Sequence, residues 1–138
     1  MRKEDVKYII VHCSATPEGR DVKAEEVRRW HVEENGWSDI GYHWIIELDG
    51  ELKKGRAESR SGAHAKGWNG KSVGVCYIGG TDSNGNAKDT RTDGQKITLG
   101  CLLQDLRGRY PKAKIIGHRD ISSKECPSFD AKTEYASI

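Results

Sequence analysis

Two mostly apolar segments, residues 6–13 and 72–78, constrain the fold of this chain more than any other feature. Neither segment alternates regularly between polar and apolar side chains, so both are expected to be strands that are buried on two faces. Residues 114–117 predict a short final strand. Strands of this kind need helices on their faces to keep them from water, which favours the α/β class.

The stretch between the first two strands contains a helical pattern. Residues 22–34 place Val27, Trp30 and His31 on one face, and Gly36 follows as a stop signal. We interpret His31 as a core or half-buried residue of this helix. The tryptophans of this region are interpreted as packing residues: Trp30, Trp37 and Trp44.

A hairpin is predicted over residues 42–54. Its strands would be Tyr42–Leu48 and Glu51–Lys54, joined by Asp49-Gly50, a pair that favours a two-residue turn. Within the first strand, Tyr42 and His43 point in opposite directions because side chains alternate. If Tyr42 faces a functional site, His43 has a structural role.

A second helix is predicted to begin after Thr92, which forms a capping-box pattern with Gln95, and to end near Tyr110. Its expected apolar positions are Ile97, Cys101, Leu102 and Leu106. Residues 81–91 are polar and rich in turn-forming residues, which is typical of a surface loop. Strands interleaved with helices therefore predict one domain, residues 1–138, with a single mixed β-sheet flanked by helices.

Composition excludes several classes of protein. Hydrophobic residues make up 35% of the 138 residues and charged residues 32%, which is typical of a globular protein. No apolar run approaches the roughly 18 residues of a membrane span. A net charge of +2 is too small to indicate a nucleic-acid partner. We expect a monomer that binds neither membranes nor nucleic acid.

The N-terminus is charged and leads directly into a strand, without an apolar signal region. The chain is therefore expected to be cytoplasmic when synthesised, or to leave the cytoplasm without a signal peptide. In that setting free thiols or a metal ligand are expected rather than a disulfide framework. The four cysteines are Cys13, Cys76, Cys101 and Cys126.

Three residues could close on one metal ion. His12 lies at the end of the first apolar segment, His118 follows the last one, and Cys126 is a short loop further on. Two imidazoles and a thiolate are ligands that zinc favours, and three protein ligands leave a fourth position for water. Functional residues of open α/β sheets gather at the carboxyl ends of strands, where both histidines are predicted to lie.

Spacing alone leaves other interpretations open. A histidine at a strand end is often only a hydrogen-bonded side chain, and a cysteine hydrolase would use Cys126 or Cys13 with a histidine. Cys13 is adjacent to His12 on a strand, so the two side chains point to opposite faces. Cys13 is therefore interpreted as a core residue, and Cys76 and Cys101 as small buried hydrophobes.

The motifs together resemble a known family. They are YIIVHCSAT (8–16), DIGYHWII (39–46), GAHAKGWN (62–69), SVGVCYIGG (72–80), IIGHRDIS (115–122) and KECPSFD (124–130). In this order they resemble the zinc-dependent N-acetylmuramoyl-L-alanine amidases, a family that includes T7-type phage lysozymes and peptidoglycan recognition proteins. The resemblance covers nearly the whole chain and is weakest in the loop at 81–91 and in the C-terminal tail.

The resemblance implies specific roles. His12, His118 and Cys126 match the ligands of one Zn²⁺ ion, while Tyr42 and Lys124 match residues that assist catalysis. The implied reaction is hydrolysis of the amide between N-acetylmuramic acid and L-alanine in bacterial peptidoglycan. Some members of the family bind cell wall without cutting it, and these typically lack the cysteine ligand. Retention of Cys126 favours an enzyme, with a non-hydrolytic binding module as the alternative.

The glycine-rich segment 62–69 is expected to shape the substrate groove. His64, Trp68 and Asn69 offer an imidazole, an aromatic ring and an amide for sugar and peptide groups. His64 could equally make hydrogen bonds within a loop. Lack of a signal peptide fits a phage endolysin released through a holin, and a cytoplasmic recycling amidase would look similar.

Overall fold

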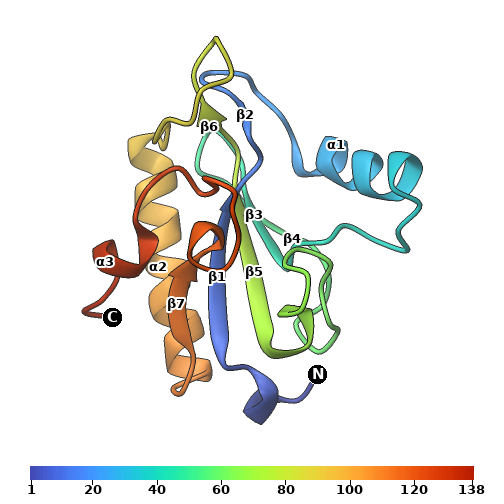
Figure 1. Cartoon of the computed structure of the whole chain (residues 1–138), viewed down its shortest axis with the longest axis vertical. Coiled ribbons are helices and arrows are strands. Elements are labelled where there is room, and N and C mark those ends of the chain that lie inside the picture. The colour runs from blue at the N-terminus through green and yellow to red at the C-terminus, as the bar shows by residue number, and fades with distance from the viewer.

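The computed structural model describes residues 1–138 and is built on a five-stranded sheet with the strand order β4-β3-β5-β1-β7 (Figure 1). Neighbouring strands are parallel except β4, which runs antiparallel to β3. The predicted mixed sheet flanked by helices is confirmed. The five strands are β1 (Tyr8–Cys13), β3 (Trp44–Ile46), β4 (Leu52–Lys54), β5 (Ser72–Tyr77) and β7 (Lys114–Gly117).

The central strands β1 and β5 are buried along almost their whole length, as their apolar sequences predict. Alternate residues of β1 face opposite sides of the sheet. Ile9, Val11 and Cys13 pack in the large core beneath the long helix, whereas Ile10 packs with Ala65 on the opposite face. His12 has the same parity as Ile10. The strand therefore sends Cys13 into the core and His12 to the other side, as expected.

The long helix α2 (Asp93–Arg109) covers one face of the sheet (Figure 1). Its predicted capping box is present, because Gln95 N donates to Thr92 Oγ1 at 3.1 Å and Thr92 N donates to Gln95 Oε1 at 3.0 Å. The predicted apolar face was partly wrong. Ile97 is 69% exposed and Cys101 is also exposed. Leu102 and Leu106 are buried as predicted, and Leu99 and Leu103 complete the buried stripe in place of Ile97 and Cys101.

The predicted helix over residues 22–34 is present but changes geometry. Residues Ala24–Arg29 form α1, and Trp30–Glu34 continue as a wider turn of π-helix. Gly36 ends the segment with φ of +71°, a conformation that favours glycine. Such π turns are often found at functional sites, and this one contains His31.

The hairpin is present, but its strands are shorter than the predicted Tyr42–Leu48 and Glu51–Lys54. Its predicted two-residue turn was also wrong. Glu47 N donates to Glu51 O at 2.9 Å, and Gly50 N donates to Glu47 O at 2.8 Å. The loop therefore has three residues, and Gly50 adopts φ of +91°. This is the three-residue hairpin loop with a glycine in the left-handed region, which an Asp-Gly pair also fits.

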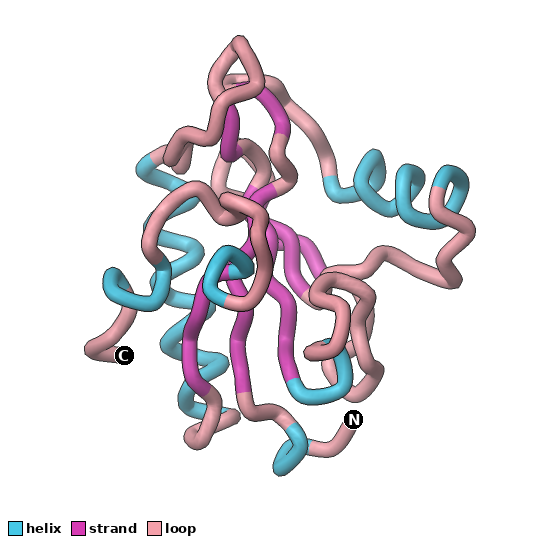
Figure 2. The backbone as a smooth tube through the Cα atoms, viewed as in Figure 1, coloured by secondary structure: helices cyan, strands magenta, loops and turns pink.

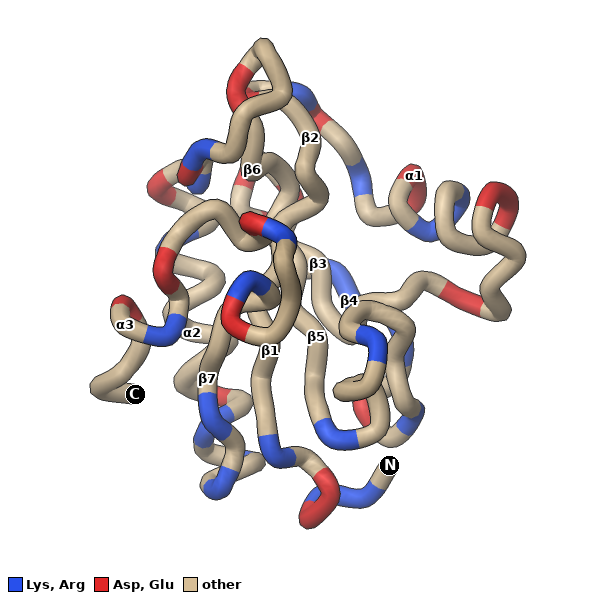
Figure 3. The backbone as a smooth tube through the Cα atoms, viewed as in Figure 1, with Lys and Arg blue, Asp and Glu red and all other residues tan.

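The remaining chain is largely loop, including most of the segment that precedes β5 and the segment that follows β7 (Figure 2). Acidic and basic residues are interspersed over the molecule (Figure 3). No helix has the length and apolar character needed to cross a lipid bilayer. The smaller elements are the paired strands β2 (Thr16–Pro17) and β6 (Gly80–Thr81) and the helix α3 (Ala131–Glu134). Short 3-10 helices are formed by Lys3–Asp5, Asn69–Lys71 and His118–Asp120.

Arg91 ties the C-terminal segment to the loop before α2. Its side chain is only 2% exposed. The guanidinium donates two hydrogen bonds to Asp89 at 2.8 and 2.9 Å and two to Glu134 at 2.8 Å. It also donates to Tyr135 Oη at 2.9 Å and lies 3.5 Å from the ring centre of Phe129. These contacts anchor the chain that follows Cys126.

We expect Arg91→Met to lower the free energy of unfolding at pH 7 by about 2 to 3 kcal/mol, because charged hydrogen bonds are lost. Arg91 lowers the pKa of both Asp89 and Glu134 in the folded protein, chiefly through its hydrogen bonds. The contribution of these two carboxylates to the free energy of unfolding is therefore present above the usual carboxyl pKa of about 4. It is lost as the pH falls through their lowered pKa values.

Urea unfolding of Arg91→Met and the wild type should consequently show a difference in stability that narrows below about pH 4. The control is Arg29→Met, because Arg29 is exposed on α1. A pH-independent difference would show that packing against Phe129, rather than charge, accounts for the stabilisation.

Candidate functional site

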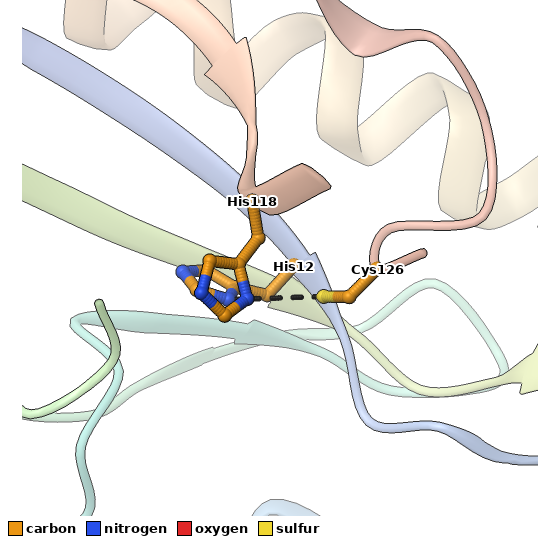
Figure 4. A group of neighbouring side chains, drawn as sticks. All are labelled: His12, His118 and Cys126. Carbon is orange, nitrogen blue, oxygen red and sulfur yellow. Dashed lines mark hydrogen bonds between the residues drawn. The ribbon is translucent and has the colours of Figure 1, made fainter. Parts of the chain in front are cut away.

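Two histidines meet where neighbouring parallel strands end. His12 is the fifth residue of the six-residue strand β1, and His118 directly follows Gly117, the last residue of β7. Because β1 and β7 are paired and parallel, the two imidazole rings come within 4.6 Å of each other, centre to centre. Figure 4 shows both rings facing the thiol of Cys126. The strand ends therefore bring together residues that are more than a hundred positions apart.

The loop carrying Cys126 is held against the sheet by several contacts. Tyr77 Oη donates to Pro127 O at 2.7 Å, and Ser128 Oγ donates to Gly80 O at 2.8 Å. A side chain at Gly117 would meet Pro127 Cδ at 2.8 Å, so glycine lets the loop approach β7 closely. The Cys126 sulfur accepts a hydrogen bond from Cys13 N at 3.1 Å. The backbone of β1 thus favours negative charge on Cys126.

The three predicted ligands lie close enough together to share one metal ion. Their donor atoms lie within 4.8 Å of one another, and His12 Nδ1 is 3.8 Å from Cys126 Sγ. Zinc bonds of about 2.0 to 2.1 Å to nitrogen and 2.3 Å to sulfur place such atoms about 3.6 Å apart at the tetrahedral angle. The chemistry and the separation of these donors both fit a zinc ion.

The protonation states of the three donor side chains also favour binding of a cation. Burial lowers the pKa of His12 well below its usual value, and His64, His118 and Lys124 lower it further. The pKa of His118 is likewise lowered by burial and then by Lys124. Both imidazoles are therefore neutral at pH 7. The nearby Cys13 thiol and burial raise the pKa of Cys126, so its thiolate needs a cation beside it.

Tyr42 lies beside His12. The centre of its ring is 5.2 Å from that of His12 and 5.5 Å from that of His31. His31 is half-buried and accepts a hydrogen bond from Gly41 N at 2.9 Å, which fixes the backbone just before Tyr42. Burial, followed by the thiols of Cys76, Cys126 and Cys13, raises the pKa of Tyr42 well above its usual value. Its phenol is therefore a hydrogen-bond donor at neutral pH.

His43 has the structural role that alternation along the strand predicted. It is fully buried. Its Nδ1 accepts from Gly74 N at 3.0 Å, and its Nε2 donates to Arg60 O at 2.8 Å. Both ring nitrogens are thus used to join the hairpin strand to β5 and to the following loop.

A groove with a volume of about 600 Å³ opens beside the three donors. Of the three donors, His118 lines this groove. Lys124 is exposed on the loop between His118 and Cys126 and lines the same groove. The other lining residues are Trp37, Ala63, His64, Ala65, Lys66, Gly67, Asn69, Ile121 and Ser122. Two lysines and no acidic side chain give this surface a positive charge.

The three predicted substrate residues have different surroundings. His64 lines the groove and also contacts His12, with 2.8 Å between His64 Nδ1 and His12 Nε2. Asn69 lines the groove and uses Oδ1 to accept from His64 N and Ala65 N, each at 2.9 Å. Trp68 lines another groove, packs edge-to-face on Tyr8 at 4.8 Å and lies beneath Lys71 Nζ at 4.3 Å. Their roles in binding substrate stay predictions.

Two groove residues were not predicted from the sequence as functional. Trp37 was interpreted as a packing residue, but it contacts His31 at 4.6 Å between ring centres and also lines the groove. Lys66, between His64 and Trp68, is exposed at the groove as well. The only sequence signal for Lys66 was its place within the glycine-rich motif, and no signal distinguished Trp37.

Comparison with known proteins agrees with this geometry. The family model described as N-acetylmuramoyl-L-alanine amidase matches residues 2–129. The chain is 46% identical to the endolysin of Enterobacteria phage K11 over 129 residues, covering 94% of this chain and 85% of that protein. It is 44% identical to the endolysin of Escherichia phage T7 over 131 residues, covering 95% and 86%.

Solved structures show the same fold. The amidase LysC from Clostridium intestinale superposes with a TM-score of 0.79 at 26% identity, covering 96% of this chain and 83% of that one. The Drosophila protein PGRP-LB superposes with a TM-score of 0.78 at 28% identity, covering 96% and 80%. The match to the family model spans nearly the whole chain, including all three donors. This protein therefore belongs to the N-acetylmuramoyl-L-alanine amidase family.

Proposed function

We propose that this protein is a zinc-dependent amidase that hydrolyses the bond between N-acetylmuramic acid and L-alanine in bacterial peptidoglycan. The observation that carries the proposal is the convergence of His12, His118 and Cys126 beside an open groove that His118 lines. One Zn²⁺ ion, when bound there, would polarise the scissile carbonyl and lower the pKa of a water molecule toward 7. Family membership supports the substrate assignment.

The residues around the donors supply the remaining chemistry. The Lys124 ammonium, at the edge of the groove, is suited to stabilise the negative charge that develops on the carbonyl oxygen as the amide is attacked. The Tyr42 phenol keeps its proton at neutral pH and is suited to donate a hydrogen bond beside His12. Tyr42 therefore acts as a donor that orients the reacting groups rather than as a general base.

The similarity to phage endolysins suggests the biological setting. We infer that the protein degrades the cell wall from within an infected bacterium as a monomer, after a holin-type release. Two structurally similar proteins, a PGRP-LB variant and the complex of PGRP-LCa with PGRP-LCx, bind tracheal cytotoxin. That likeness supports a muropeptide as the occupant of the groove.

Removal of the metal provides the test. Digestion of purified muropeptides should stop when zinc is chelated and should resume when zinc is added back, because the donors alone provide no activated water. Mass spectrometry should detect new free amino groups on L-alanine. Thiol alkylation in the presence of bound zinc should have little effect.

Other outcomes would point to other functions. Digestion that continues under chelation but stops on alkylation would indicate a cysteine hydrolase. New reducing sugar ends would indicate a glycosidase. Retention of muropeptide without any cleavage, with zinc present, would indicate a binding module of the same fold.

A further inference from the structure

We propose that His64 is a positioning residue, which fixes the proton of His12 on Nε2 and so leaves His12 Nδ1 free to bind metal. This inference rests on the proposed zinc site and adds a function for a residue outside the three donors. The supporting observation is a continuous chain of hydrogen bonds, called the relay below, that leads from His12 through His64 and Ser72 to Trp68 O.

The direction of each hydrogen bond follows from the last member of the chain. A backbone carbonyl only accepts, so the Ser72 hydroxyl must donate its one proton to Trp68 O, 2.7 Å away. Ser72 Oγ can then only accept from His64 Nε2, at 3.3 Å. The other nitrogen of the neutral His64 ring, Nδ1, is consequently an acceptor.

His12 must therefore be the donor to His64. The distance from His12 Nε2 to His64 Nδ1 is 2.8 Å, a normal hydrogen bond. With its proton on Nε2, the neutral His12 ring has a lone pair on Nδ1. That nitrogen is the one 3.8 Å from Cys126 Sγ. The relay thus selects the tautomer of His12 that presents its lone pair to the metal position.

The surroundings of His64 hold its ring in one place. Asn69 Oδ1 accepts from the backbone of His64 and of Ala65, each at 2.9 Å. A Cβ atom at Gly74 would lie 2.6 to 2.7 Å from three atoms of the His64 ring, and one at Gly62 would lie 2.7 Å from its Cδ2. The two glycines therefore leave a slot that the imidazole fills. Free rotation of the ring would require these backbones to move.

A matched pair of variants tests the relay. Asparagine and leucine have similar size, but only asparagine has an oxygen near the place of His64 Nδ1 that can accept from His12. We expect His64→Leu to raise the zinc dissociation constant about 10- to 100-fold, the usual effect of losing a partner of a metal-ligating histidine. His64→Asn should retain most of the affinity. Competition with a chelating dye measures both.

The tautomer itself can be observed without metal. In ¹⁵N NMR spectra of the zinc-free protein, His12 should carry its proton on Nε2 in the wild type and in His64→Asn. In His64→Leu it should become a mixture of both tautomers. Should the leucine variant fail to fold, Ser72→Ala provides the second test, because His64 then loses the acceptor that fixes its own proton.

Each outcome supports or overturns one proposal. Wild-type zinc affinity in His64→Leu, with the His12 proton still on Nε2, would overturn the relay and leave the zinc amidase intact. Failure of the wild-type protein to bind zinc would instead overturn the proposed function. The NMR result on the metal-free protein would still decide whether His64 sets the tautomer of His12.

Discussion

Replacing Cys126 with serine is expected to abolish hydrolysis and to weaken zinc binding by at least about a thousandfold, or about 4 kcal/mol of binding free energy. A thiolate is a strong ligand for zinc, whereas a serine hydroxyl stays protonated at neutral pH and binds poorly. The variant would keep both imidazoles but only two effective ligands. Zinc content after dialysis and muropeptide digestion measure the two losses.

Cys101→Ser is the matched control, because this exposed thiol on α2 lies on the opposite side of the sheet. It should keep wild-type zinc content and activity. Thermal unfolding of both variants in the absence of zinc would separate loss of the ligand from loss of the fold. A Cys126→Ser protein that hydrolyses muropeptides at the wild-type rate would rule out the proposed metal site.

The convergence of His12 and His118 could be predicted from sequence because strand ends are encoded locally. The apolar runs before His12 and His118 define buried strands, and the carboxyl ends of parallel neighbours must meet at one edge of a sheet. Alternation along β1 also separated His12 from Cys13 correctly. The position of Cys126 could not be derived in this way, because its loop is fixed by distant partners such as Tyr77.

Errors arose where tertiary contacts decide between similar local patterns. Ile97 and Cys101 have helical spacing, but so does the leucine stripe beginning at Leu99, and only docking on the sheet shows which is buried. The Asp49-Gly50 pair fits loops of two or three residues equally well. The register of the flanking strands, which places Ile46 opposite Leu52, determines that the loop has three residues.

The groove was the least predictable part of the site. Its walls come from loops, and loop side chains are oriented by individual hydrogen bonds rather than by a period. Trp37 and Trp68 illustrate the difficulty, since one lines the groove beside His118 while the other packs on Tyr8. Nothing in the residues next to either tryptophan distinguishes these two environments.

Lys124→Ala is expected to lower kcat by about 100- to 1,000-fold while leaving bound zinc in place. The ammonium is an exposed group of the groove and no ligand of the metal. It nevertheless lies within electrostatic range of the donors, because its charge adds to burial in lowering the pKa of His118. A fixed positive charge here would stabilise the transition state more than the neutral ground-state amide, so the loss should appear in kcat rather than in KM.

The control for this variant is Lys96→Ala, which removes an exposed lysine of α2 on the far face of the sheet and should leave kcat unchanged. Lys124→Arg keeps the charge and should recover part of the loss, although its planar guanidinium presents the charge differently. Zinc content measured in parallel separates a loss of metal from a loss of catalysis. Unchanged kcat in Lys124→Ala with full zinc content would remove Lys124 from the reaction and assign charge stabilisation to other groups of the groove.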